Sequence, residues 1–581
     1  AKVLEKINKG RRSKKMNTLL LLIIGIAVLL CGYIFYGKWL CKQWGVGESN
    51  EPTPAHALED GIDYVPAKAP VLMGHHFSSI AGAGPITGPI AAAVFGWLPA
   101  TLWILIGGIF FGGVHDFGAL FASVRHKGQS IGEIINVNMG KRAKRLFIIF
   151  AYLTLILVVA AFASIVAGTF KATFVNGVVD KAASAANASV AMVSILFIFI
   201  AIVFGFCVYR KNAPMLVSSI IGVIAIVICM AVGMNWHPLY FSNTTWMIIV
   251  GVYIAIASIT PVWILLQPRD YLSSFLLYAM LAVAIIGVVG AHPNIDPSVF
   301  PVFAMPKGSP IFPVLFTTIA CGAISGFHSL VSSGTTSKQL DKETDAKPIA
   351  YGGMLLECVL AILTICAISY AKVTGHTAGA TDIFAGGIAA MVASIPGLKG
   401  LETILYTLLI LTYSAFCLTS LDTATRLARF MFQEFWLEPG QTVKDVKDGW
   451  KKVMVNPIFA TILTVVLGIA LGMTGWSKIW GLFGASNQLL AGIGLLAVAT
   501  WLGNAGKNNK MFLFPMAFMV VVTISSLAIT IKNQIATIMQ GTSDWGPYAQ
   551  VAIAALLIVL AIVLVIEGVS TLAKQKKAKK A

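Results

Sequence analysis

Charged residues are scarce in this chain of 581 residues: Asp, Glu, Lys and Arg make up 11% of it, against about 25% in soluble domains. Hydrophobic residues make up 57%, and the mean hydropathy is +0.83. This composition excludes a water-soluble enzyme and a disordered protein. It predicts an all-α polytopic membrane protein, because each spanning helix needs about 20 mostly apolar residues.

The sequence lacks the motifs of the common enzyme and pump classes. It contains no His-Glu-x-x-His metalloprotease motif, no phosphate-binding P-loop and no Gly-x-Ser-x-Gly nucleophile elbow. The eight cysteines form no Cys-x-x-Cys pair and lie mostly in apolar segments, which predicts small buried side chains rather than disulfides or a zinc site. We therefore expect no enzyme activity, no cofactor and no metal, and a transport process driven by an ion gradient.

Acidic residues are rarer than basic ones, and the net charge is +18. The Lys and Arg residues lie in short loops between apolar runs, which is typical of cytoplasmic loops and does not indicate a nucleic-acid partner. The first unit, residues 1–41, has a basic stretch followed by an apolar run from Leu19. That run continues past Leu30 without a small-residue cleavage site, so we expect a retained helix rather than a signal peptide.

The rest of the chain divides into a polar loop at 42–73, a transport core at 74–502, and C-terminal helices with a basic tail at 503–581. With one crossing per apolar run, alternate loops hold 25 and 7 Lys and Arg residues, which predicts a cytoplasmic C-terminus. On this count the apolar stretch 383–396 does not cross. The sequence leaves the orientation of the first helix undecided. The basic residues before Met16 place loop 42–73 outside, whereas two separate spans within 75–118 place it inside.

One motif occurs twice. Residues 74–82 and 326–334 both read Gly-x-His-x5-Gly, and Ser and Thr accompany each copy. Interrupted helices at matching positions of two halves mark the binding site of inverted-repeat secondary transporters. The pattern therefore predicts broken helices near 74–89 and 317–336, and a chance match is the alternative.

The first copy is rich in residues that break helices. Pro85 and Pro89 remove helical hydrogen bonds, and its glycines let the backbone unwind and approach a ligand. Backbone amides freed at the break would attract an anionic group, and freed carbonyls would attract a cation. The histidines titrate near neutral pH and could relay a proton. A Gly-rich packing face and satisfied interfacial histidines are the alternatives. The candidate substrate-binding residues are His75, His76, Ser78, Ser79, Gly82, Gly84, His328, Ser332 and Ser333.

Carboxylates within apolar segments are costly and mark functional sites. The candidate ion-coupling residues are Asp116, Asp422, Thr419, Thr423 and Glu357. An ion pair between Asp422 and Arg426, four residues later on the same helix, is the structural alternative, and Glu357 could pair with a lysine.

Two further polar stretches have simpler interpretations. Arg269 and Asp270, after Pro268, predict a cytoplasmic turn with a local ion pair. Ser486, Asn487 and Gln488 predict bonds to another helix, with a pore-lining role as the alternative.

Several of these segments together resemble the carbon starvation protein A family. The matching segments are TPAHALEDGIDYVP (53–66), GHHFSSIAGAGPITGP (74–89), HDFGALF (115–121), PVWILLQPRDYL (261–272), TTIACGAISGFHSLVSSGTT (317–336), ETDA (343–346), LDTATRLARFM (421–431) and FGASNQLLA (483–491). The resemblance implies a secondary transporter related to the amino acid–polyamine–cation group, in a prokaryotic cytoplasmic membrane, active in carbon starvation. The chain departs from it at His115, where relatives tend to carry Gln, and has one helix instead of two before residue 53.

We therefore expect proton-coupled import of short peptides across the cytoplasmic membrane. Pyruvate–proton symport is the first alternative, and Na⁺-coupled uptake of a small carboxylate or amino acid, with Na⁺ beside Asp422, is the second. The expected partners are a small-molecule substrate and the lipid bilayer.

Overall fold

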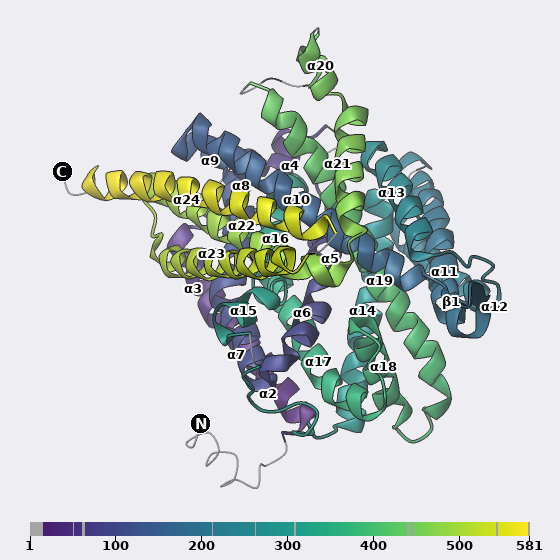
Figure 1. Ribbon diagram of the computed structural model, residues 1–581. Helices are drawn as coiled ribbons and strands as arrows, with labels where there is room; N and C mark the ends of the chain where they lie inside the picture. The colour runs from purple at the N-terminus through teal and green to yellow at the C-terminus, as the bar shows by residue number, and fades with distance from the viewer. Residues whose placement is uncertain are drawn as a thin grey trace, which may run out of the picture.

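Helices make up nearly all of the regular structure (Figure 1). The computed structural model describes residues 16–49, 51–60, 64–211, 213–261, 263–306, 309–438, 441, 443–447, 449–541 and 544–578. The basic stretch before Met16, which the sequence analysis assigns to the first unit, lies outside these residues.

The first half of the chain holds thirteen of the labelled helices and one short hairpin. The helices are α2 (Thr18–Cys31), α3 (Gly37–Trp44), α4 (Pro54–Ala57), α5 (Ala69–Ile80), α6 (Gly84–Ala92), α7 (Trp97–Gly107), α8 (Gly113–Arg125), α9 (Ile131–Met139), α10 (Lys141–Phe170), α11 (Lys181–Gly205), α12 (Met215–Asn235), α13 (Asn243–Ile259) and α14 (Leu266–Ala291). The antiparallel hairpin joins β1 (Thr173–Val175) to β2 (Val178–Asp180).

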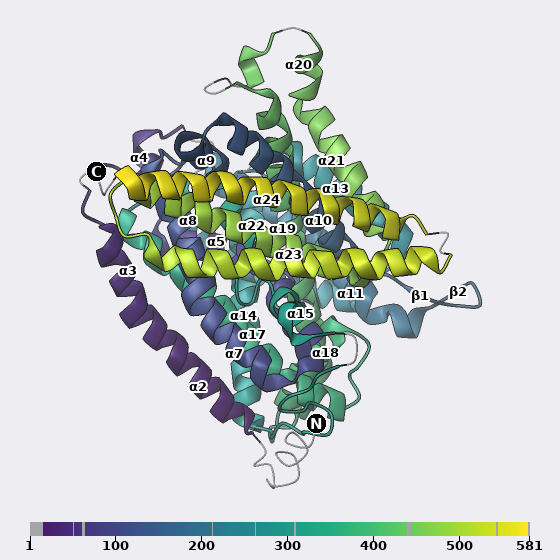
Figure 2. The same ribbon diagram turned by 60° about the vertical axis from the view of Figure 1, so that its left-hand side comes forward.

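The second half holds the remaining labelled helices. They are α15 (Ile311–Thr318), α16 (Gly326–Gly334), α17 (Gly352–Val373), α18 (Ala380–Ala393), α19 (Glu402–Trp436), α20 (Trp450–Met454), α21 (Pro457–Gly472), α22 (Trp476–Asn504), α23 (Lys510–Met539) and α24 (Gly546–Ala578). In Figures 1 and 2, α23 and α24 run side by side along one flank, next to α22.

Within the described residues, 11 helices are long and apolar enough to cross a membrane, and the number is 12 when the bent pair α5–α6 counts as one span. Large apolar side chains point outward: on α12, Leu216, Ile220 and Ile224 are each more than half exposed. Exposing such an apolar surface to water is unfavourable, whereas exposing it to lipid is not. The expected all-α polytopic class is confirmed.

Contacts between loops sort the helix ends into two groups. On one side, named here the Pro293 face, the Thr18 N–H donates to the Pro293 carbonyl at 3.0 Å. On the other, the Lys338 face, the Val65 N–H donates to the Lys338 carbonyl at 3.3 Å. The α2–α3 segment connects the two faces (Figure 2).

Loop 42–73 lies on the Lys338 face. There Lys507 pairs with Glu48 at 3.5 Å, and Arg125 pairs with Glu343 at 2.9 Å. These partners come from loops that the charge count groups together as cytoplasmic. Since α5–α6 and α7–α8 are separate segments between the two faces, loop 42–73 lies on the same face as these loops, which is the alternative with two separate spans within 75–118.

The second expected break falls at residues 319–325, between α15 and α16. Two amide side chains of α22 satisfy its unwound backbone: Gln488 donates to the Phe316 and Ile319 carbonyls at 2.6 and 3.2 Å, and Asn487 accepts from the Phe327 N–H at 2.9 Å. Irregular backbone survives at membrane depth only when its polar groups are satisfied in this way. Asn487 and Gln488 therefore do bond another helical segment.

The first break falls at residues 81–83, and α5 and α6 meet there at a bend of 42°. Ser420 of α19 donates to the Ser79 carbonyl at 3.3 Å, and Thr87 shares a 2.8 Å hydrogen bond with the Tyr413 hydroxyl. Both contacts tie the broken helix to α19. The two broken helices expected from the repeat are thus present.

Candidate functional site

Four side chains form a buried histidine–carboxylate cluster: His115, Asp116, His328 and Glu357. His115 Nδ1 and His328 Nδ1 each lie 2.7 Å from one oxygen of Asp116, and His328 Nε2 lies 3.5 Å from Glu357 Oε2. All four side chains are fully enclosed. The fold thus brings together Asp116 from α8, His328 from α16 and Glu357 from α17, while Glu357 has no lysine partner within the described residues.

A second group, the arginine–carboxylate cluster, consists of Tyr253, Arg269, Asp270 and Asp422. Arg269 pairs with Asp422, and the Tyr253 hydroxyl donates to the same carboxylate at 2.8 Å. Arg269 Nη2 lies 3.7 Å from Asp270 Oδ1, and His75 Nδ1 lies 3.6 Å from Asp270 Oδ2. The Arg269, Asp270 and Asp422 side chains are each at most 1% exposed.

The local ion pair expected between Arg269 and Asp270 is present, but the expected turn and the alternative pairing of Asp422 with Arg426 are wrong. Arg269 and Asp270 do not form a cytoplasmic turn, because α14 begins at Leu266 and encloses both side chains. The partner of Asp422 is Arg269 rather than Arg426, whose guanidinium instead donates to the carbonyls of Ala257 and Thr260 at 2.7 and 2.6 Å. Arg426 therefore caps the C-terminal end of α13.

The two carboxylates of the arginine–carboxylate cluster are compensated unequally. Arg269 pairs closely with Asp422, and Arg426 also acts on Asp422 electrostatically, whereas the described residues place only the 3.7 Å contact to Arg269 and the His75 ring against Asp270. An uncompensated charge inside a membrane protein is expensive. A proton or a cationic ligand group at Asp270 would remove it.

The hydroxyls predicted around Asp422 are all buried. Thr419 and Ser79 contribute to the polar surroundings of Asp270, and Thr423 follows Asp422 on α19. The predicted Thr419 and Asp422 thus share one site with Ser79 of the first break, whereas Asp116 and Glu357 belong to the other cluster.

Two further predicted side chains, His76 and Ser78, lie beside the clusters: His76 interacts electrostatically with Asp116 and His328. His76 Nδ1 bonds the Thr336 hydroxyl at 2.8 Å, and Ser78 donates to the His75 and Asp270 carbonyls at 3.2 Å each. Ser332 is buried on α16, and Ser333 donates to the Ser329 carbonyl at 2.7 Å.

The glycines of the first break are packing positions. A Cβ on Gly84 would lie 2.2 Å from the Cys321 Cβ in the second break, and a Cβ on Gly82 would meet the Phe162 ring and Ser420 at 2.9 Å. These glycines therefore admit neighbouring protein segments, which corrects the expectation that they make room for a ligand and matches the packing alternative.

A cavity lies at each face. On the Pro293 face, a cavity of about 380 Å³ is lined by Lys171 and Asp382 and reaches the Thr87–Tyr413 hydrogen bond. On the Lys338 face, the lining of a cavity of about 450 Å³ includes Gln129, Glu133, Lys144, Ser333 and Glu434. Neither lining includes a member of the two buried clusters.

Lys144 joins three helices at the second cavity. It contacts Glu133 of α9 at 2.7 Å and Glu434 of α19 at 2.9 Å. Burial alone would raise the pKa of Glu133, but the hydrogen bonds from Lys144 and Asn136 outweigh it and lower that pKa below its ordinary value. The three charged side chains therefore hold together the ends of α9, α10 and α19 on the Lys338 face.

Sequence reasoning missed Tyr253, Arg269, Asp270 and Cys321 as members of the site. A signal existed for the two charged residues: they stand next to the apolar run 271–290, with a proline before them. Tyr253 and Cys321 carry no such signal, because each is an ordinary residue of an apolar segment.

Two broken helices, an apolar exterior and two enclosed polar clusters define a polytopic secondary transporter. The model of the family described as "Carbon starvation protein CstA" matches residues 17–378 and 369–526. The chain belongs to this family.

The similar curated proteins carry two kinds of name. The chain is 32% identical to a peptide transporter CstA of Bacillus subtilis (87% of this chain, 89% of the relative) and 33% identical to one of Helicobacter pylori J99 (92% and 84%). It is 30% identical to the pyruvate/proton symporter BtsT of Escherichia coli (84% and 77%).

Among solved structures, a histidine-to-alanine mutant of the manganese transporter of Eremococcus coleocola aligns with a TM-score of 0.50 at 12% identity, covering 89% of this chain and 99% of that one. At this identity the likeness concerns the fold alone. It agrees with the transporter fold that the repeat and the family resemblance predict.

Proposed function

We propose that this protein imports short peptides across the cytoplasmic membrane, coupled to protons, when carbon is limiting. The observation that carries the proposal is the buried Asp270 carboxylate, which shares the Arg269 guanidinium with Asp422 and lies 3.7 Å from it. A peptide ammonium or a proton would each neutralise this charge. The names of the CstA relatives support peptides as the substrate.

The same cluster offers a cation for the other end of a peptide. Arg269 Nη2 is buried and has no hydrogen-bond partner within the described part of the chain. A guanidinium recognises carboxylates through paired N–H donors. A zwitterionic peptide would then place its carboxylate at Arg269 and its ammonium at Asp270.

Pyruvate–proton symport is the second candidate, favoured by the similarity to BtsT. Pyruvate needs only the guanidinium, so Asp270 would then hold the coupling proton. Na⁺ coupling requires oxygen ligands, and Thr419 and Thr423 on α19 lie within three residues of Asp422 in sequence.

The proposed orientation places the Lys338 face and the C-terminus in the cytoplasm. The loops assigned to the inner side hold 25 Lys and Arg residues and the outer loops 7, as the positive-inside rule requires. Cysteine labelling at residues 127 and 399, on opposite faces, tests this: the reagent should reach position 399 from outside intact cells and not position 127.

The functional test is uptake by proteoliposomes of labelled dialanine and of labelled pyruvate, with an inward proton gradient. We expect dialanine to accumulate, a protonophore to abolish uptake, and Asp270→Asn to lower it at least about tenfold. Glu567→Gln removes a surface carboxylate that pairs with Arg142 at 3.2 Å and is the matched control.

Other outcomes decide between the candidates. Uptake of pyruvate alone would replace the peptide proposal by the second candidate. Uptake that survives the protonophore and requires a Na⁺ gradient would overturn proton coupling, and uptake of neither compound would overturn both proposals.

A further inference from the structure

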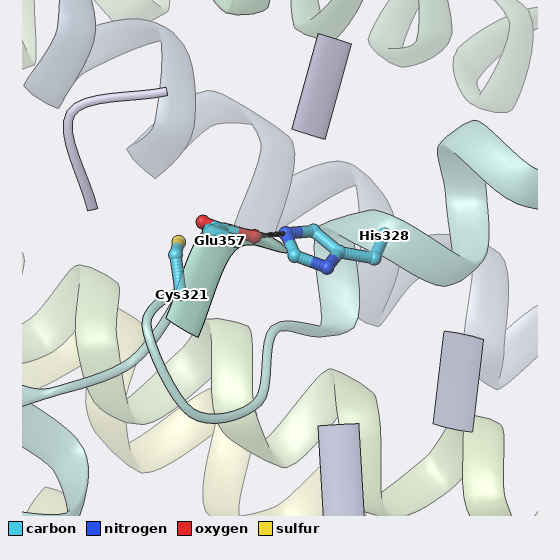
Figure 3. A group of neighbouring side chains, drawn as sticks. All are labelled: Cys321, His328 and Glu357. Atoms are coloured by element: carbon cyan, nitrogen blue, oxygen red, sulfur yellow. Dashed lines mark ion pairs between the residues drawn. The ribbon is translucent and has the colours of Figure 1, made fainter. Parts of the chain in front are cut away.

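The histidine–carboxylate cluster contains possible metal-ligand atoms that have no hydrogen-bond partner within the described residues. Both carboxylate oxygens of Glu357 and the Nε2 of His328 are buried and make no hydrogen bond within the described residues. The Nε2 points at Glu357 Oε2 across 3.5 Å, as Figure 3 shows. A buried carboxylate needs a cation; within the described residues a protonated His328 can serve as one, and a metal ion bound between the two side chains would take its place.

Cys321 adds a third ligand atom. It lies in the second break, and its thiol is on the same side of the His328 ring as Glu357 (Figure 3). The three ligand atoms, from Cys321, His328 and Glu357, lie within 4.8 Å of one another. Ligands of a tetrahedral zinc ion at about 2.0–2.3 Å stand about 3.3–3.7 Å apart, so closing around an ion requires shifts of about 1 Å.

The surroundings already orient two of these ligands. The carboxylate of Asp116 accepts from His328 Nδ1 at 2.7 Å, which leaves the Nε2 lone pair free for a ligand. The Asn487 amide donates toward the Cys321 sulfur at 3.7 Å. Carboxylate–histidine–metal chains and hydrogen bonds to ligand atoms are the usual outer contacts of metal sites.

We propose that Cys321, His328 and Glu357 form a buried site for one divalent transition-metal ion of the zinc class. Three protein ligands leave a fourth coordination position open. A thiolate and an imidazole select zinc-class ions over Na⁺, Mg²⁺ and Ca²⁺, which prefer oxygen ligands. A dication would neutralise the thiolate and the Glu357 carboxylate, while the Asp116 carboxylate keeps its contacts to His115 and His328.

This site departs from the expectation that the cysteines bind no metal. That expectation rested on the absence of Cys-x-x-Cys pairs, and a site assembled from α16, α17 and the second break has no such signature. The ion would also connect the unwound segment that holds Cys321 to α17. The proposal is independent of the substrate and of proton coupling.

The test measures metal binding by the purified full-length protein in detergent. After chelation and removal of the chelator, we expect one equivalent of Zn²⁺ to bind per chain and to raise the melting temperature. Co²⁺ in its place should give a thiolate-to-cobalt absorption band, which reports a sulfur ligand in the wild-type protein without any variant.

Variants locate the ion. Cys321→Ser and Glu357→Gln should each weaken Zn²⁺ binding at least about 100-fold, and Cys321→Ser should abolish the cobalt band. Cys366→Ser is the matched control, because that buried thiol on α17 is directed at the Thr18 carbonyl at 3.6 Å and not at the cluster.

Three results would overturn the proposal: a wild-type protein that binds no stoichiometric Zn²⁺, a cobalt complex without a thiolate band, or equal binding by Cys321→Ser and Cys366→Ser. If Cys321→Ser does not fold, the cobalt band of the wild-type protein decides alone. Transport activity enters none of these measurements, so failure of the transport proposal leaves this test intact.

Discussion

Removing the Arg269 charge should destabilise the protein far more than removing the Asp270 charge. Arg269→Gln removes the closest cation from two carboxylates whose side chains are at most 1% exposed, and Arg426 then remains as a more distant cation for Asp422 alone. Breaking one side of a buried ion pair costs about 3–5 kcal/mol. Asp270→Asn instead leaves one guanidinium facing one carboxylate, a balanced pair, so we expect it to be neutral or stabilising.

The assay is unfolding of the purified protein in mixed micelles at increasing fractions of denaturing detergent. The double variant Arg269→Gln/Asp422→Asn completes a double-mutant cycle. Because it removes both members of the closest pair, it should recover part of the loss, with a coupling of about 0.5–3 kcal/mol. Glu567→Gln, at a partly exposed surface pair, should change stability by less than about 1 kcal/mol.

The charges of the cluster predict an order of stability among the three variants, and the unfolding assay can contradict it. If Asp270→Asn is as destabilising as Arg269→Gln, the cluster carries no excess negative charge, and the basis of the proposed transport mechanism is gone. If Arg269→Gln is no worse than Glu567→Gln, the ion pair with Asp422 does not support the fold. A stable but inactive Asp270→Asn protein is the expected result, since functional sites often lower stability.

Three further outcomes follow from local contacts. Gly84→Ala should cost about 1–3 kcal/mol by overpacking against the second break, whereas Gly168→Ala, with nothing within 4 Å of the added Cβ, should be harmless; both are measured by the same unfolding assay. Asn487→Leu should cost about 1–3 kcal/mol, because the buried N–H at the start of α16 loses its acceptor, and a stable variant would show that another group replaces it. The lowered pKa of Glu133 contributes stability that is present above its ordinary value of about 4.3 and is lost as the pH falls through the folded-state value; the melting temperature should therefore fall more steeply between about pH 6 and pH 3.5 in the wild type than in Glu133→Gln, and identical slopes would refute this.

The sequence was sufficient for the helical class and for both breaks because their causes are local. Apolar runs of about 20 residues predict spans, and the proline and glycine pattern at 74–89 predicts an interruption. The repeat then located the second interruption around His328. These features depend on neighbours along the chain, so no knowledge of packing was needed.

The pairing within the clusters depends on packing and could not be read in advance. Asp422 has Arg426 one helical turn away, yet its partner is Arg269, which is 153 residues distant in the chain. Arg269 in turn was assigned to a loop, because hydropathy cannot show that α14 begins before the apolar run does. The side of loop 42–73 stayed open in the sequence for a related reason: the basic N-terminus and the crossing pattern disagree, and only packing shows which loops share its face.

The two breaks differ in the hydrogen bonds that hold them within the described residues. The second break is bound at both its carbonyl and its amide ends by Gln488 and Asn487 of α22, through three hydrogen bonds. The first break is tied to α19 by the single contact from Ser420 and, farther along α6, by the Thr87–Tyr413 pair. Alternating access needs one element to move against another. Because fewer bonds must break there, we expect the first break and α19 to separate while the second break moves together with α22, which would open the Pro293-face cavity toward Asp270.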